Sequence, residues 1–243
     1  MYQHILLDIT DNIATITLNR PEKLNAYTVD MGEEIVEVFD QLKDDDTARV
    51  IILTGAGRGF CAGVDLDHMK EQATATDLKG PRLGEERLVR EFPLTLLNYP
   101  KPVIAAINGH AIGVGITMVL PCDIRLAASS AKLGLTFAKM GILPGLGSTY
   151  LLPRLVGVPK ARELVLSSGV IEAAEGAAIG LINRVVAPDE LISVAREMAV
   201  SMAQCKPAVF AAAKGLLLSG ESEAVAEAMR RERQASGALR KRG

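Results

Sequence analysis

The spacing of hydrophobic residues divides the first part of the chain into strands and a helix. Two short β-rich runs, His4 to Thr10 and Ile13 to Arg20, are separated by two polar residues, which is the spacing of a hairpin. From Thr28 to Lys43 the apolar residues recur every three or four positions opposite acidic ones, which predicts an amphipathic helix. The wholly apolar run Val50 to Leu53 predicts a strand buried on both faces.

Strands and helices continue to alternate in the middle of the chain. We expect a strand over Pro102 to Ile107, a helix over Ile112 to Leu120 and a strand over Asp123 to Ala128. Beyond about Gly147 the strand signals fade. Helices are predicted over Val158 to Ser167, Ala173 to Ala178, Pro188 to Ala203, Pro207 to Leu218 and Ser222 to Leu239. The pattern indicates an α/β protein of one domain, 1–243, with a helical C-terminal region.

One apolar stretch, Val103 to Cys122, has the length of a membrane span. The sequence Asn-Gly-His at 108–110 interrupts it near the middle, and prolines at 102 and 121 bracket it. This arrangement favours a buried strand, a turn and a buried helix over a transmembrane segment.

Composition and charge exclude several classes of protein. The chain is 49% hydrophobic and 23% charged, which is typical of an ordered globular protein. The 27 basic and 29 acidic residues give a net charge of −2, so nucleic acid is not an expected partner. Cys61, Cys122 and Cys205 are too far apart for a disulfide framework or a zinc site, and the N-terminus lacks the pattern of a secretory signal. We therefore expect a cytoplasmic protein without a bound metal.

Two glycine-rich turns carry the first sign of chemistry. The segments Thr54 to Leu66 (TGAGRGFCAGVDL) and Ile107 to Gly115 (INGHAIGVG) each follow a predicted buried strand. Glycines let backbone N–H groups converge on one point, and two such turns can place one N–H each around a carbonyl oxygen. This spacing suggests an oxyanion site, although glycines after strands are more often simple turns.

A dinucleotide site is the remote alternative for the first turn. Gly55, Gly57 and Gly59 resemble the phosphate-binding turn of NAD(P)-dependent short-chain dehydrogenases. Phe60 and Cys61 stand where the last glycine belongs, and a hairpin and a helix precede a strand that should open the chain.

Five motifs together resemble the crotonase (enoyl-CoA hydratase/isomerase) family, in its order and spacing and over nearly the whole chain. They are NRPEKLNA at 19–26, GFCAGVDL at 59–66, KPVIAAINGHAIGVG at 101–115, CDIRLA at 122–127 and LPRLVG at 152–157.

The resemblance implies a fold, a substrate class and an assembly. The fold is a crotonase-like spiral of ββα units over about 1–190, followed by C-terminal helices over about 191–243 that mediate trimerisation. The substrate is an acyl-CoA thioester, with coenzyme A as part of it and no separate cofactor, and the assembly is a homotrimer or hexamer. The chain stops at ALRKRG, earlier than family members usually run, so we expect the last helix to be clipped.

The resemblance also implies site residues. The two oxyanion N–H groups fall on Val64 and Val114. Coenzyme A is held in this family along loops represented here by Lys23, Leu24, Ala26, Ala62, Asp65, Leu66 and Asp67. Asp65 is alternatively only the cap of a following helix, and Lys23 only a solvated charge.

The usual acid and base are missing. The hydratases' two glutamates fall on Thr117 and Phe137, and the later carboxylate of some isomerases, hydrolases and dehalogenases falls on Gly145. Phenylalanine and glycine have no titratable side chain, and the threonine hydroxyl does not ionise near neutral pH. The reaction therefore stays open among hydration, isomerisation, hydrolysis and decarboxylation, with a non-catalytic acyl-CoA-binding protein as the alternative.

Three other residues are weak candidates for the acid or base, namely Glu86, His68 and His110. The spacing of Arg82, Glu86 and Arg90 at i, i+4 and i+8 favours a solvated ion-pair ladder instead. A histidine such as His110 is more often a local hydrogen-bonding residue than a catalyst.

Overall fold

A six-stranded sheet forms the centre of the computed structural model, which describes residues 2–75, 77, 80–218 and 220–240. Its strands in spatial order are β1 (Ile5–Thr10), β2 (Ile13–Leu18), β3 (Val50–Gly55), β5 (Val103–Ile107), β7 (Ile124–Ala128) and β10 (Arg184–Val186). The first two strands form an antiparallel hairpin, and every later pairing is parallel. Residues 50–53 of β3 and all of β5 are apolar and buried, as expected of the central strands of a covered parallel sheet.

The two glycine-rich segments contribute strands to a smaller second sheet. It consists, within the described residues, of β4 (Gly59–Cys61), β6 (His110–Ile112), β8 (Lys132–Gly134) and β9 (Val170–Glu172), in that spatial order. Strand β4 follows β3 along the chain, and β6 follows β5. Neighbouring strands of the first sheet thus lead into neighbouring strands of the second.

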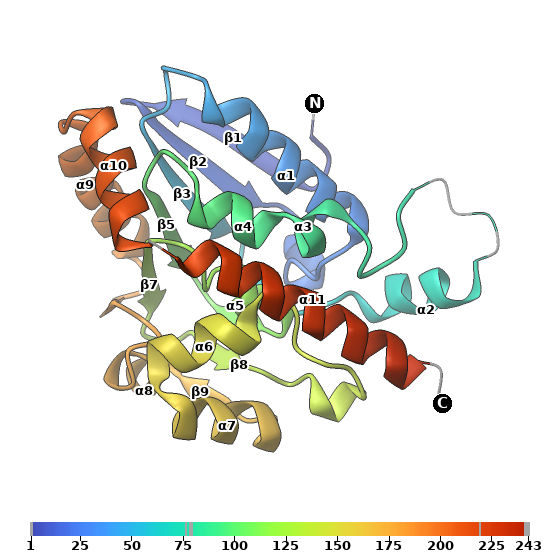
Figure 1. Cartoon of the computed structure of the whole chain (residues 1–243). Coiled ribbons are helices and arrows are strands. Elements are labelled where there is room, and N and C mark those ends of the chain that lie inside the picture. Colours follow the sequence, from blue (N-terminus) through green and yellow to red (C-terminus); the bar gives the residue numbers. More distant parts are fainter. Residues whose placement is uncertain (1, 76, 78–79, 219, 241–243) are drawn as a thin grey trace.

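Helices cover the large sheet. Helix α1 (Val29–Lys43) begins at Thr28, whose side-chain oxygen accepts a hydrogen bond from the Met31 N–H at 3.2 Å. It lies in front of the sheet in Figure 1, beside α3 (Arg87–Arg90) and α4 (Phe92–Leu97). Helix α9 (Leu191–Ala203) packs against β2, β3, β5 and β7.

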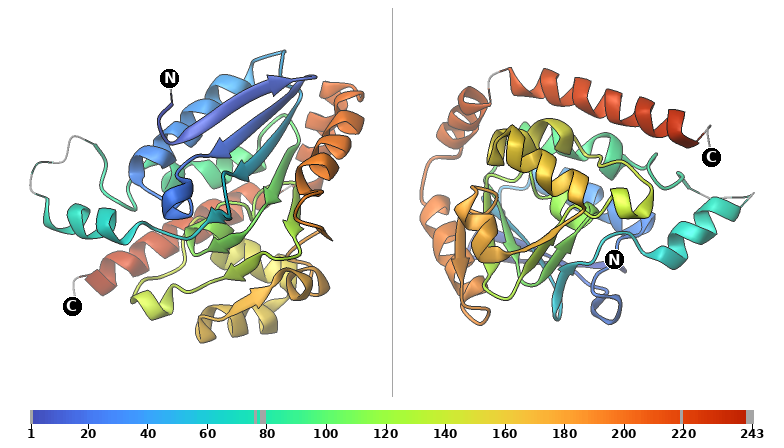
Figure 2. Two further views of the ribbon diagram at one scale, coloured as in Figure 1. Left: turned by 180° about the vertical axis from the view of Figure 1, so that it is seen from behind. Right: turned by 90° about the horizontal axis from the view of Figure 1, so that it is seen from below.

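The remaining helices extend the chain around this core, as both views of Figure 2 show. They are η1 (Pro21–Lys23), α2 (Leu66–Thr74), α5 (Val114–Thr117), η2 (Ala138–Met140), α6 (Ser148–Val156), α7 (Val158–Ser167), α8 (Ala173–Ala178), α10 (Pro207–Leu217) and α11 (Glu221–Arg240). Helix α11 packs on α4 and α6. Its buried Glu232 accepts hydrogen bonds from the Gly147 and Thr149 N–H groups, both at 2.9 Å, and so joins the C-terminal helix to the start of α6.

Most predicted elements are confirmed, and two predictions are wrong. The helix expected over Ile112 to Leu120 shrinks to α5, because Ile112 belongs to β6 and Gly113, with φ +56°, separates the two. Strands also continue past Gly147, as β9 and β10, each only three residues long and thus too short for a periodic signal. The hydrophobic pattern predicts no strand at the residues that form β8. The stretch expected to be buried at 103–122 forms β5, β6 and α5, and no helix in the described residues is long and apolar enough to cross a membrane.

A close contact explains a glycine near the start of α1. A Cβ atom on Gly32 would lie 2.1 Å from the hydroxyl oxygen of buried Tyr27. Glycine costs a helix interior about 1 kcal/mol relative to alanine, so space for the hydroxyl is the physical reason for it here.

We expect Gly32→Ala to lower the free energy of unfolding by about 1 to 3 kcal/mol, because overpacking outweighs the gain in helix propensity. The matched control is Gly237→Ala in α11, where no atom lies within 4 Å of an added Cβ, and stability should hold or rise. Chemical denaturation followed by circular dichroism measures both. Equal stability of the two variants would contradict the proposed contact.

Candidate active site

The two glycine turns lie side by side at the ends of two parallel strands. Strands β4 and β6 pair in parallel, with Cys61 opposite Ala111. A Cβ atom placed on Gly113 would lie 3.9 Å from the Cα of Gly63. Both glycines have positive φ, +103° at Gly63 and +56° at Gly113, so other residues would be strained there.

The Val64 N–H is oriented by a bridge to Tyr27. The Tyr27 N–H donates to the Gly63 carbonyl oxygen at 2.7 Å, and the Asp65 N–H donates to the Tyr27 carbonyl oxygen at 2.9 Å. The Gly63 carbonyl and the Val64 N–H belong to one planar trans peptide group, so they point in opposite directions. The Val64 N–H therefore points away from Tyr27, and it has no protein acceptor in the described part of the chain.

The Val114 N–H is free for a different reason. Val114 is the first residue of α5, and the first N–H groups of a helix have no acceptor inside it. The preceding carbonyl, of Gly113, accepts the Thr117 N–H at 3.1 Å, which fixes the Gly113–Val114 peptide. Two oriented N–H donors on adjacent turns can polarise the carbonyl oxygen of a substrate.

Uncharged side chains stand at the three positions where the resemblance to the family places carboxylates. Thr117 is fully buried, and its hydroxyl lies 3.3 Å from the Gly113 carbonyl oxygen. The Phe137 ring faces the second turn, with Cε1 4.0 Å from a Cβ placed on Gly113. Among the described residues, apart from its chain neighbours, no atom lies within 4 Å of a Cβ placed on Gly145. Burial raises the pKa of the adjacent Cys61 thiol to about 12, so it is protonated near neutral pH and is a poor nucleophile.

The predicted coenzyme A loops are brought together. The Ala62 N–H donates to the Leu24 carbonyl oxygen at 3.1 Å, and exposed Lys23 and Asp67 form an ion pair at 3.3 Å. The other predicted residues, Ala26, Asp65 and Leu66, lie on the same two segments. The same two segments carry the bridge between Tyr27 and Val64.

Asp65 has the capping role considered as its alternative. One carboxylate oxygen accepts the Asp67 N–H at 3.0 Å and the His68 N–H at 3.3 Å, which caps α2, and the other accepts from Arg20 at 2.9 Å. Burial alone would raise the pKa of Asp65, but the hydrogen bonds from Arg20, His68 and Asp67 lower it overall. The carboxylate is therefore ionised and tied down.

The three acid–base candidates have different environments. His68 Nε2 lies 3.2 Å from the Val29 N–H, at the start of α1, and accepts from it. His110 Nδ1 is buried without a hydrogen-bond partner among the described residues. The predicted ladder around Glu86 is wrong, because Glu86 is fully buried and accepts a hydrogen bond from the Tyr27 hydroxyl at 2.8 Å. Local spacing could not reveal a partner 59 residues away.

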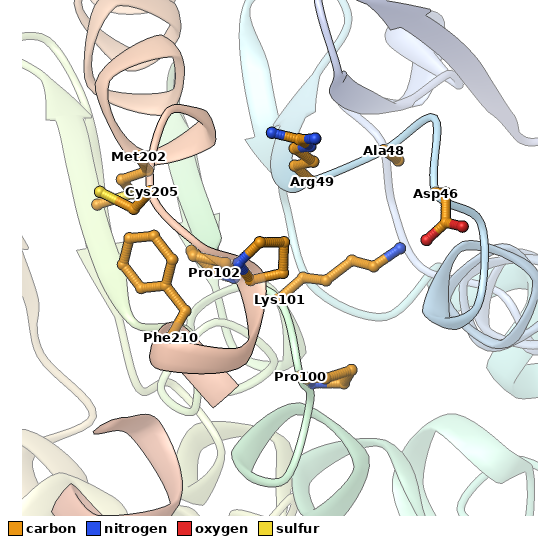
Figure 3. Close-up of a pocket in the computed structure, with 10 residues that line it drawn as sticks. Asp46, Ala48, Arg49, Pro100, Lys101, Pro102, Met202, Cys205 and Phe210 are labelled. Atoms are coloured by element: carbon orange, nitrogen blue, oxygen red, sulfur yellow. The ribbon is translucent and has the colours of Figure 1, made fainter. Parts of the chain in front are cut away.

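A cavity of about 390 Å³ lies elsewhere, and its lining is drawn in Figure 3. Arg49, Lys101 and Pro102 line it at the start of β3 and β5, with Phe210 from α10. The glycine turns follow the opposite ends of these strands, and no predicted site residue lines the cavity. In the described part of the chain there is also no cluster of three or more metal-ligating His, Cys, Asp or Glu side chains.

Comparison with known proteins identifies the family. The sequence model of the enoyl-CoA hydratase/isomerase family matches residues 8–241. The 1,2-epoxyphenylacetyl-CoA isomerase of Escherichia coli K12 is 40% identical over 84% of this chain and 77% of its own. The short-chain-enoyl-CoA hydratase of Clostridium acetobutylicum is 37% identical over 96% of this chain and 88% of its own.

A solved structure supports the same assignment at the level of the fold. An enoyl-CoA hydratase/isomerase from Pseudoalteromonas atlantica T6c superposes with a TM-score of 0.88 at 29% identity, covering 98% of this chain and 91% of that one. The crotonase fold and the enzyme family expected from the motifs are thus confirmed. The chain belongs to the enoyl-CoA hydratase/isomerase family and is an acyl-CoA enzyme.

Proposed function

We propose that this enzyme binds the thioester carbonyl of an acyl-CoA at the N–H groups of Val64 and Val114 and acts on the acyl chain through the resulting enolate. The observation that carries the proposal is the pair of oriented backbone donors, without protein acceptors in the described residues, on adjacent turns. The loops with Lys23, Leu24 and Ala62 hold coenzyme A beside them. No separate cofactor is part of the proposal.

Backbone donors suit this chemistry because negative charge develops on the thioester oxygen when the α-carbon gains or loses a bond. Donors that are already oriented stabilise that charge without reorganising. The side chain is irrelevant to an N–H donor, so valine at 64 and 114 is compatible with the role. The branched side chain of Val114, only 5% exposed, narrows the space beside the second donor.

The missing carboxylates determine which reactions this site can accelerate. Addition of water to an enoyl thioester needs one group to take a proton from water and another to deliver a proton to the α-carbon. Thr117, Phe137 and Gly145 supply neither. We therefore propose that hydration is slow in this enzyme, although relatives named as hydratases are 32 to 37% identical to it.

Decarboxylation is a second candidate that the same vacancies favour. In a 2-carboxyacyl thioester the bond between the α-carbon and the carboxylate breaks, carbon dioxide leaves, and the electron pair enters the thioester enolate. Water then supplies the proton to the α-carbon. This reaction needs the oxyanion donors but no protein base, and the apolar Phe137 beside the second turn suits departure of a carboxylate.

The donor assignment is tested by two substitutions at Val114. Val114→Pro removes the N–H and should lower turnover by about 10² to 10³, whereas Val114→Gly keeps it and should retain turnover. Proline is tolerated at the first position of a helix, which Val114 occupies in α5, so the variant is expected to fold. Initial rates with malonyl-CoA and crotonyl-CoA measure the effect, and circular dichroism checks the fold. Equal rates for the two folded variants would remove Val114 from the mechanism.

The vacancies are tested by restoring the carboxylates. One positioned acid or base contributes about 10² to 10⁴ in rate, so hydration of crotonyl-CoA should be slow in the wild type and faster in Thr117→Glu/Phe137→Glu. Loss of the enoyl thioester absorbance band measures hydration.

The single variant Gly237→Asp, on α11 and in open space, is the control for an added carboxylate that leaves all three positions vacant. A wild type as fast as an ordinary hydratase would show that an acid and base are present elsewhere, with His68, His110 and Glu86 the first to mutate. Binding of acyl-CoA without turnover of any of these thioesters would instead favour a non-catalytic binder.

A trimer is the proposed assembly, and α10 supports it. This helix has no buried residue, and Val209, Leu216 and Leu217 on it are 61%, 78% and 84% exposed. An apolar helix of this kind is expected to be covered by another copy of the chain. The resemblance to the crotonase family points to a trimer, or a hexamer built from trimers.

Light scattering coupled to size exclusion tests the assembly. Three copies of 25.9 kDa predict about 78 kDa, or twice that for a hexamer. Leu216→Arg should lower the mass towards one copy, because a charge would be buried at the contact. Leu166→Arg on α7, at a leucine 76% exposed, should not. A monomeric wild type at micromolar concentration would contradict the proposal.

A further inference from the structure

A carboxylate is buried in the core beside the first oxyanion turn. Glu86 is fully buried, and no lysine, arginine or histidine pairs with it among the described residues. One of its oxygens accepts from the Tyr27 hydroxyl at 2.8 Å and the other from the Gly84 N–H. Tyr27 is itself buried. A buried carboxyl group is costly unless it is hydrogen-bonded, and here the two described donors are both neutral.

The surrounding helix is adapted to this hydrogen bond. The Tyr27 hydroxyl occupies the space that a Cβ on Gly32, near the start of α1, would fill. Helix propensity alone favours almost any other residue at that position. Two unfavourable features, a glycine within a helix and a buried carboxylate, therefore converge on one phenol.

The backbone of Tyr27 holds the peptide that carries the first oxyanion donor. Its N–H donates to the Gly63 carbonyl oxygen at 2.7 Å, and its carbonyl accepts the Asp65 N–H at 2.9 Å. Because the Gly63–Val64 peptide is planar, fixing its carbonyl also fixes the direction of the Val64 N–H. The Tyr27–Val64 pairing is an isolated bridge outside both sheets. On the Tyr27 side, the peptide is therefore held by this bridge and not by a run of paired strand residues.

We propose that Tyr27 and Glu86 form a positioning pair, in which the hydrogen bond from phenol to carboxylate fixes Tyr27 and thereby aims the Val64 N–H at the substrate's thioester oxygen. The two side chains hydrogen-bond to each other and to the Gly84 N–H, so in this proposal the pair acts through the Gly63–Val64 peptide. The inference rests on the proposed oxyanion function of Val64 and Val114.

The test uses a ligand whose spectrum reports carbonyl polarisation without turnover. In 4-(dimethylamino)cinnamoyl-CoA an electron-donating amine is conjugated with the thioester, so stabilising charge on the carbonyl oxygen moves the absorption band to longer wavelength. We expect a red shift on binding to the wild-type enzyme. Tyr27→Phe should lose about half or more of that shift while still binding the ligand, because one of the two donors is misaimed.

The matched control is Tyr99→Phe. Tyr99 is another buried tyrosine of the same core, and its hydroxyl donates to the Phe39 carbonyl oxygen at 2.7 Å. It has no link to Gly63 or Val64 among the described hydrogen bonds. The full red shift should survive in this variant. With a substrate that turns over, Tyr27→Phe should lower kcat by about 10-fold to 100-fold with little change in KM, because misplacing a catalytic group affects the transition state.

A double variant separates positioning from stability. Tyr27→Phe alone leaves the Glu86 carboxyl group without the hydrogen bond from Tyr27 and destabilises the fold. The double variant Tyr27→Phe/Glu86→Leu removes both polar partners and should recover much of the thermal stability. The red shift should remain reduced in the stable double variant. Recovery of the full shift together with stability would overturn the inference and leave the pair a structural feature.

Two further outcomes are equally decisive. A full red shift in Tyr27→Phe, with the wild type also shifted, overturns the positioning role and leaves the oxyanion proposal intact. No shift in the wild type overturns the oxyanion proposal itself and the inference with it. The wild-type spectrum thus distinguishes the two failures.

Discussion

The planarity of two peptide groups governs what this fold can do at its site. In Gly63–Val64 and in Gly113–Val114, the carbonyl is engaged by the protein and the N–H is left without a protein acceptor in the described residues. Because carbonyl and N–H are rigidly opposed, each internal hydrogen bond fixes the direction of one N–H, and we propose that the two N–H groups bind one thioester oxygen. The larger architecture supports this arrangement: β3 and β5 lead into β4 and β6, and the parallel pairing of β4 with β6 sets the two turns side by side.

The proposed site separates two functions that enzymes commonly combine. Stabilisation of negative charge depends on backbone geometry, which Val64 and Val114 preserve despite their side chains. Proton transfer depends on side-chain chemistry, and Thr117, Phe137 and Gly145 do not provide it. An enzyme with the first function and without the second is suited to reactions in which the enolate forms by loss of a group, with water as the proton source. Decarboxylation is therefore proposed as a reaction of this enzyme beside a slow hydration.

The sequence predicts this architecture well where the signal is local or carried by motifs. The amphipathic period of α1 and the apolar run of β3 lead directly to the observed elements. The sequence predicts a helix at Ile112 because buried strands and buried helices share an apolar composition. In the structure the positive φ of Gly113 separates β6 from α5. The three-residue strands β8, β9 and β10 are too short for periodicity and form through pairing with distant partners.

Glu86 shows the limit of sequence interpretation at the site. Its charged neighbours at helical spacing predict a solvated side chain, yet tertiary packing buries it against Tyr27, which no local pattern connects to it. The glycine turns are visible in the sequence, but as a site they stay a prediction, because glycines after strands are more often simple turns. Their pairing followed from the resemblance and is explained by the register of β4 and β6.

The most direct test of the account is the carbonyl stretching frequency of a bound acyl-CoA, measured by infrared difference spectroscopy with the thioester carbon ¹³C-labelled to identify the band. Polarisation by two backbone N–H groups weakens the C=O bond, so the band should move to lower wavenumber than in water, and much of that displacement should vanish in Val114→Pro. A bound thioester with the same frequency as in water would contradict the claim that these two peptides form the catalytic centre.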